Sequence, residues 1–144
     1  MRLEFFRRNR RAFFHQRRDV KKVMAVAALE AGSSGIDSLD LLVATLDRPR
    51  AARVVKDLGE DPRVIEIAAR GARASRDPRP GLTDDAKAVV EAVGHRAIRA
   101  RADWDVQDLL VALATADCLA RQVLNAHRID AAALVARVGG PAPS

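Results

Sequence analysis

The chain has 144 residues and a formal net charge of +6. Residues 1–22 hold nine Lys or Arg and two acids, a net of +7, which leaves −1 for residues 23–144. This length allows one well-buried core but excludes two large independent domains, and the balanced charge of the longer segment argues against a nucleic-acid-binding body.

Composition further limits the class of protein. A single cysteine, Cys118, excludes an internal disulfide, and no apolar run is long enough for a signal sequence or a membrane span. We therefore expect a cytoplasmic protein. Because Ala and Leu are strong helix formers and aromatic residues are few, the composition predicts an all-α fold.

Residues 1–18 form a basic arm in which arginines alternate with phenylalanines, namely Phe5, Phe6, Phe13 and Phe14. Three interpretations are open. The phenylalanines cover the first helices while the arginines stay solvated, or the arm is an amphipathic helix that docks on a membrane surface or in a partner groove. Alternatively, the arm binds nucleic acid through phosphates and bases. The helical spacing of the phenylalanines favours the first two.

Residues 19–75 form a first repeat, in which apolar spacing predicts four helices. The first helix starts near residue 20 and stops at Gly32. Ser38 is the expected N-cap of the second, and Pro49 separates the second from the third. The fourth begins at Pro62 and ends near residue 74.

A second repeat follows with the same order of helices. Thr83 caps the first of them, Asp105 or Val106 opens the second, the third runs near 117–126, and Asp130 opens the last. The remaining boundaries are 76–81 for the linker, 82–138 for the second repeat and 139–144 for a flexible tail.

The two repeats share one identical pattern. Asp37, Asp40, Leu41, Leu42, Val43 and Ala44 recur at the same spacing as Asp105, Asp108, Leu109, Leu110, Val111 and Ala112. Such duplication indicates two copies of one helical unit, each too poor in apolar surface to stand alone. We therefore expect two pseudo-symmetric four-helix repeats packed as one domain. Since neither copy contains a catalytic motif, a binding surface is favoured over an active site.

The ordered set of these motifs resembles the N-terminal domain of Clp-type protein unfoldases, of the ClpC kind above all. Leu82-Thr83-Asp84-Asp85-Ala86-Lys87-Ala88-Val89-Val90-Glu91 is similar to the opening of that family's second repeat, and Leu58-Gly59-Glu60-Asp61 to the Leu-Gly-x-Asp that ends its first. The resemblance covers roughly residues 13–138 and implies a domain that recruits substrates or adaptors to an unfoldase–protease.

The resemblance also implies where a partner binds. A groove where the first helices of the two repeats meet would be lined by Leu82, Lys87 and Glu91, with Phe13 and Phe14 nearby. The chain contains no Gly-x-x-x-x-Gly-Lys-Ser/Thr loop, so we expect a free-standing recruitment or regulatory module rather than the motor. Its partners would be protein substrates, adaptors or unfoldase components, with nucleic acid bound through the arm as the alternative.

The chain departs from the family at the turn before each Leu-Leu helix. Some members bind phosphorylated arginine there through a Glu, whose place is taken by Leu39 and Gln107. The departure puts phosphoarginine binding in doubt. Trp104 occupies the place of Ile36 and is expected to pack at the second turn.

No residue pattern indicates catalysis, a metal or a cofactor. The three histidines, His15, His95 and His127, lie in separate segments without the convergent ligands that a metal needs. Cys118 lacks an oriented base, so we expect a buried structural thiol and no enzymatic activity.

Overall fold

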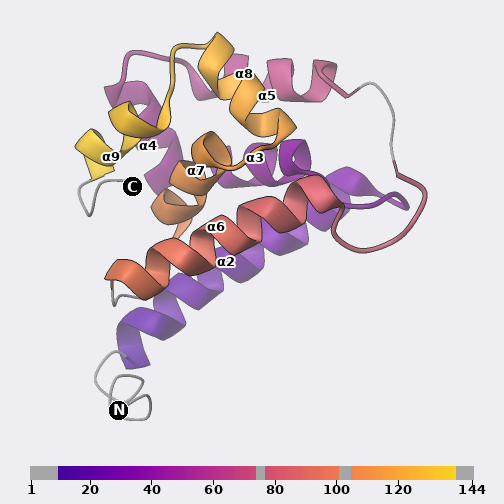
Figure 1. Ribbon diagram of the computed structural model, residues 1–144, viewed down its shortest axis with the longest axis horizontal. Coiled ribbons are helices and arrows are strands. Elements are labelled where there is room, and N and C mark those ends of the chain that lie inside the picture. Colours follow the sequence, from indigo (N-terminus) through magenta and orange to yellow (C-terminus); the bar gives the residue numbers. More distant parts are fainter. Residues whose placement is uncertain (1–9, 74–76, 101–104, 139–144) are drawn as a thin grey trace.

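A computed structural model describes residues 10–73, 77–100 and 105–138, with side chains described for 20–73, 77–94 and 105–138. The described residues form eight α-helices and one isolated β-bridge, so the predicted all-α fold is confirmed (Figure 1). The helices are α2 (Arg10–Ala31), α3 (Ser38–Leu46), α4 (Pro49–Asp57), α5 (Pro62–Gly71), α6 (Asp84–Ala100), α7 (Val106–Thr115), α8 (Leu119–Ala126) and α9 (Ala131–Val138).

Two short helices that carry the repeated Leu-Leu sequence, α3 and α7, form the centre of the molecule. Every residue of α3 and seven of the ten residues of α7 are buried. Helices of this kind are stable only when other elements surround them. The long helices α2 and α6 lie on one side of this pair, and the short helices α4, α5, α8 and α9 lie on the other (Figure 1).

The contacts between helices correspond from one half of the chain to the other. α2 and α5 pack against α3 in the same way that α6 and α9 pack against α7. Across the two halves, α3 contacts α8 while α7 contacts α4, and α5 contacts α8 while α9 contacts α4. Two duplicated four-helix units that share one core would make this set of contacts.

The first helix is longer than the sequence pattern indicated. α2 begins at Arg10, so the predicted boundary between arm and repeat at residue 18 falls inside a continuous helix. The physical reason is local: residues 10–31 contain no glycine or proline and are rich in Ala, Arg and Lys, all good helix formers. The predicted stop at Gly32 is confirmed, and Gly32 takes a left-handed φ of 64°.

Equivalent helices in the two halves end in the same backbone conformation. Gly59, two residues after the end of α4, has φ of 87°, and Arg128, two residues after the end of α8, has φ of 63°. Only glycine adopts this left-handed region without steric cost, so the second half keeps the turn with a less favourable residue. Pro49 and Pro62 stand in the first turns of α4 and α5, where the missing N–H of proline is not needed.

The segment before α3 and the linker before α6 lie against each other. The backbone N–H of Ile36 donates to the carbonyl of Gly81 (2.9 Å), and that of Thr83 donates to the carbonyl of Ile36 (3.0 Å). Gly35 lies so close that an added Cβ would stand 2.9 Å from the carbonyl oxygen of Arg79. A glycine is therefore required here, and the start of the second repeat is fixed onto the first.

Within the described part of the chain, no single helix is long and apolar enough to cross a membrane; α7 and α8 meet the length and composition only together, as a pair bent by 91°.

Candidate partner-binding surface

The repeated aspartates form a capping box at the start of each central helix. Asp37 Oδ1 accepts from the N–H of Asp40 (2.9 Å), and Asp40 Oδ2 accepts from the N–H of Asp37 (3.1 Å). In the second half, Asp105 Oδ1 accepts from Asp108 N (3.2 Å) and Asp108 Oδ2 from Asp105 N (2.9 Å). These carboxylates satisfy backbone donors that helix starts leave unpaired, so the repeated spacing has a structural role.

The prediction that Ser38 is the N-cap of α3 is wrong by one residue. Asp37 is the N-cap, and Ser38 is the first helical residue. The Ser38 hydroxyl instead accepts from the N–H of Ala120 in α8 (3.0 Å). The Ser38 side chain, which local capping preferences would place at the N-cap, therefore makes a tertiary hydrogen bond instead.

Asp85 connects three helix N-termini. Its Oδ2 accepts from the N–H of Ser38 in α3 (2.9 Å), and its Oδ1 accepts from the N–H of Leu119 in α8 (2.9 Å). The predicted cap of α6 itself is Thr83, and this prediction is confirmed, because the Thr83 Oγ1 accepts from the N–H of Ala86 (3.2 Å). One negative charge thus lies where the positive ends of three helix dipoles meet.

The predicted buried thiol is confirmed. Cys118 is the N-cap residue of α8, is 6% exposed, and its Sγ lies 3.4 Å from the carbonyl oxygen of Leu113. Burial raises the pKa of Cys118, which keeps the sulfur protonated and unreactive. His127 is the C-cap residue at the other end of α8, so the two do not form a nucleophile and base.

An arginine cluster connects α2 and α5 to the first capping box. Glu30 Oε1 accepts from Arg70 Nε (2.8 Å) and from Arg73 Nη1 (3.4 Å), and Arg73 also pairs with Asp40, which is fully buried. The hydrogen bond from Arg70 is the largest of the effects that lower the pKa of Glu30, and burial opposes it. Because Glu30, Arg70 and Arg73 pair with one another or with Asp40, we assign no ligand site to this cluster.

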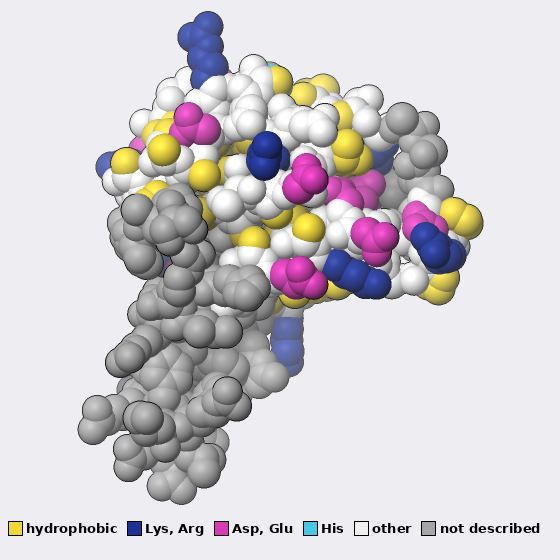
Figure 2. Space-filling model, in the orientation of Figure 1, with side chains coloured by type: hydrophobic (Ala, Val, Ile, Leu, Met, Phe, Trp, Pro, Cys, Tyr) yellow, Lys and Arg dark blue, Asp and Glu magenta, His cyan; other side chains and the backbone are white. Residues whose placement is uncertain are grey.

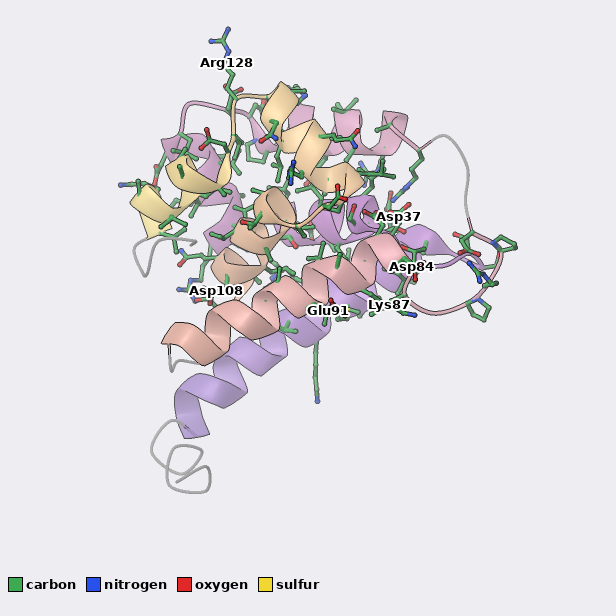
Figure 3. The ribbon with its side chains drawn as sticks, viewed as in Figure 1. Asp37, Asp84, Lys87, Glu91, Asp108 and Arg128 are labelled. Atoms are coloured by element: carbon green, nitrogen blue, oxygen red, sulfur yellow. The ribbon has the colours of Figure 1, made fainter. Side chains whose placement is uncertain are left out.

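The outer edge of α6 is the exposed surface that contains the predicted binding residues. Ala86, Val89 and Val93 face the core and are at most 1% exposed, whereas Lys87 and Glu91 are exposed on the other face. Asp84, Lys87 and Glu91 follow one edge of the helix in Figure 3. Charged side chains of both signs, with hydrophobic atoms between them, lie along this edge in Figure 2. We call residues 87, 90, 91 and 94 the α6 edge.

Two positions of the α6 edge were missed by the sequence analysis. Val90 is 40% exposed between Lys87 and Glu91. Gly94 lies within α6, where an added Cβ would meet nothing within 4 Å. A glycine inside the predicted helix is visible in the sequence. That Gly94 stands beside open space can be seen only from the structure.

The remaining predicted binding residues have different environments. Leu82 is half-buried, packs against the core and forms the β-bridge with Ile36. Phe13 and Phe14 belong to α2, but their side chains lie outside the described residues, as does Trp104. The convergence of all five on one groove stays a prediction.

Leu39 and Gln107, the residues at the turn that the resemblance relates to phosphoarginine binding, differ in accessibility. Leu39 is fully buried in α3, so it offers nothing to a partner. Gln107 is half-buried and lines a groove at the start of α7. Neither side chain carries the carboxylate that the family uses.

That groove lies between α4, α7 and α9 and has a volume of about 560 Å³. We call it the α4–α9 groove; its lining residues are Pro49, Arg50, Arg53, Val54, Asp57, Gln107 and Arg137. No sequence pattern predicts this groove, because its arginines come from segments far apart in the chain. No group of His, Cys, Asp or Glu suited to a metal ion is found among the described residues.

Comparisons with known proteins bear on the fold. No family model matches the chain, and no curated protein matches it. Among solved structures, 29 chains match. One, described as "Preliminary structural investigations of a malarial protein secretion system", has a TM-score of 0.66 and 15% identity over 82% of this chain and 88% of that chain. At this identity the similarity shows a shared helical fold and no more.

Proposed function

We propose that this chain is a non-enzymatic protein-binding module that recognises substrates or adaptors of a Clp-type unfoldase–protease and so regulates or competes with that machine. The duplicated Leu-Leu helices and the segment 82–91 support this function through their resemblance to the N-terminal domain of those unfoldases. The eight-helix arrangement with corresponding contacts in both halves is compatible with it.

The observation that carries the proposal is the α6 edge. An exposed apolar side chain, Val90, is flanked by the opposite charges of Lys87 and Glu91, and the described part of the helix buries its opposite face in the core. Apolar contact supplies affinity to a bound peptide, and charges on either side orient it. Because the helix is fixed to the core by Ala86, Val89 and Val93, this edge is rigid before a partner arrives.

Gly94 adds an energetic argument. A glycine inside a helix costs about 1 kcal/mol relative to alanine, and the space around Gly94 would accept a methyl group. Packing within the chain therefore does not require glycine at this position. Close approach of a partner's backbone would require it, since glycine is the residue that permits such approach.

The test compares capture of host proteins by the full chain and by two variants. Lys87→Glu combined with Glu91→Lys reverses the charge order without changing the net charge, and we expect capture to fall at least about tenfold. Leu82→Asp is a poorer probe, since Leu82 packs against the core and its loss would also lower stability. The captured proteins should be displaced by the full-length unfoldase of the same host.

Gly94→Ala is the second variant. It should raise the free energy of unfolding by about 0.5–1 kcal/mol and yet weaken capture, because the methyl group enters the space that the partner uses. Arg128→Glu, an exposed charge reversal remote from α6, is the control (Figure 3). Unchanged capture by both α6 variants, or captured proteins that the unfoldase does not displace, would refute the proposal.

Nucleic-acid binding through residues 1–18 is the second candidate, favoured by the charge of +7 on residues 1–22. It predicts affinity for an oligonucleotide that falls steeply between two salt concentrations. Substitution of Arg7 and Arg8 by Ala is a cleaner test than deletion of the arm, because deletion of residues 1–18 would remove part of α2.

A further inference from the structure

The α4–α9 groove brings guanidinium groups from both halves of the chain together. Arg50 and Arg53 come from α4, and Arg137 comes from α9. Two of the three are already paired with carboxylates of the chain. Arg137 Nη2 lies 2.5 Å and Nε 3.1 Å from Asp57 Oδ2, and Arg50 Nη2 lies 3.3 Å from Asp105 Oδ2.

Arg53 is different from its neighbours. It is exposed, and among the described residues it has no ion-pair partner. Arg50, Arg53 and Arg137 carry three positive charges, against one negative charge on Asp57 in the lining and one on Asp105, which lies outside the lining but pairs with Arg50. One positive charge of the groove is therefore in excess. This excess belongs to the groove itself, because residues 23–144 as a whole carry a net charge of −1.

The other lining groups complete a site for a side chain with an apolar stem and an acidic end. Val54, 5% exposed, and Pro49 provide an apolar surface, and the Gln107 amide provides a further hydrogen-bond donor. A volume of about 560 Å³ is large enough for a few side chains of a peptide.

We propose that the α4–α9 groove binds a carboxylate of an acidic segment on a protein partner, with Arg53 as its principal ion-pair partner. This inference deepens the proposed function and rests on it only for the choice of a polypeptide as carrier of the acid. Guanidinium groups pair with carboxylates through two parallel hydrogen bonds, which gives both energy and orientation.

Charge balance favours a carboxylate over a phosphate monoester. One carboxylate neutralises the single excess charge of the groove. A phosphate monoester carries a charge of about −1.5 to −2 at neutral pH, which exceeds this single positive charge, and it would lie near Asp57 in the lining, so like-charge repulsion would oppose it.

The experiment measures fluorescence anisotropy of a labelled peptide of alternating Glu and Leu, with a Gln and Leu peptide as its neutral match. The full chain is titrated at low and at physiological salt. We expect Arg53→Glu to weaken binding of the Glu peptide by about tenfold or more, and Arg53→Gln by less. Arg128→Glu makes the same change in net charge at an exposed site away from the groove and should change affinity less than about twofold.

The comparison of Arg53→Glu with Arg128→Glu removes the contribution of the basic arm, which is the same in both proteins. Equal effects of the two variants, or equal affinity of the wild type for Glu and Gln peptides, would overturn the proposal. Displacement of the peptide by inorganic phosphate at lower concentration than by glutarate would overturn the choice of carboxylate.

Failure here is distinguishable from failure of the proposed function. The Lys87→Glu, Glu91→Lys variant should bind the Glu peptide as the wild type does, since the α6 edge does not line the groove. If that variant loses host partners while Arg53→Glu binds the Glu peptide normally, only the groove assignment is wrong. Thermal unfolding of each variant, followed by circular dichroism, confirms that the compared proteins are folded.

Discussion

The turn before α3 and the turn before α7 carry the same capping box but use their other positions differently. In the first, Asp40 is fully buried and pairs with Arg73, and Leu39 is fully buried as well. In the second, Asp108 and Gln107 are only half-buried, and Gln107 lines the α4–α9 groove. The first turn faces inward, and the second faces a surface that a ligand can reach.

The two turns therefore show which positions of the repeated sequence are needed for capping and which can take another role. Helix starts must satisfy their backbone donors, and both copies do so with the same pair of aspartates. The remaining positions are free to diverge, because the cap does not depend on them. The first turn therefore packs Leu39 into the core, while the second turn contributes Gln107 to the lining of the α4–α9 groove.

The largest expected difference concerns the second aspartate of each box. Asp40→Ala removes a buried carboxylate and leaves Arg73, which is 11% exposed, without that partner, so we expect a loss of about 3–5 kcal/mol in the free energy of unfolding. Asp108→Ala should cost less, because Asp108 is only half-buried and its surroundings remain partly solvated. Urea denaturation of the two variants measures both. Equal losses would show that the two turns are energetically equivalent.

Substitutions at Leu39 and Gln107, which lie between the two aspartates of each capping box, test the same comparison. Leu39→Gln places an amide in a fully buried position and should cost about 3 kcal/mol or more. Gln107→Leu, at a half-buried position, should change stability by no more than about 0.5 kcal/mol. Thermal unfolding of both variants decides the matter. A stability loss from Gln107→Leu as large as that from Leu39→Gln would contradict the conclusion that the first turn faces the core and the second faces the surface.

Asp85 offers a test of how the first turn depends on the second repeat. Asp85→Ala removes the acceptor for the N–H groups of Ser38 and Leu119, and we expect a loss of about 2 kcal/mol. The adjacent Asp84→Ala is the matched control, since Asp84 is exposed and should change stability by less than about 0.5 kcal/mol. Chemical denaturation of the pair gives the difference directly.

The smallest expected effect is a pH dependence confined to the first turn's arginine cluster. The lowered pKa of Glu30 means that its contribution is complete above its ordinary value of 4.5 and is lost as pH falls through the lower folded-state pKa. We expect Glu30→Gln to cost less than about 1 kcal/mol at neutral pH, because these groups are partly solvated. Denaturation curves of the two proteins should converge in acid, and a constant difference at all pH values would exclude this linkage.

Much of the fold follows from local patterns. The apolar spacing and the stops at Gly32, Pro49 and Pro62 predict helices close to those observed, because these signals act through the backbone itself. Thr83 was correctly expected to cap α6 for the same reason.

The features that were wrong or missed depend on distant contacts. Ser38 and Asp37 are both good capping residues, and the choice between them accompanies the contact of Ser38 with Ala120 in α8. The α4–α9 groove combines Arg53 and Arg137 from opposite halves, so no local spacing indicates it. Spacing placed Lys87 and Glu91 on one helix, but their exposure, like the open space at Gly94, depends on how α6 packs.

The position of Asp85 has a consequence for local opening. One carboxylate holds the first amide of α3 and the first amide of α8, so a fluctuation that moves α6 away exposes both amides to solvent in the same event. Hydrogen exchange at Ser38 and Leu119 should therefore share one opening free energy although the residues belong to different repeats. Motion at the start of α6 is thus communicated to both halves of the protein at once.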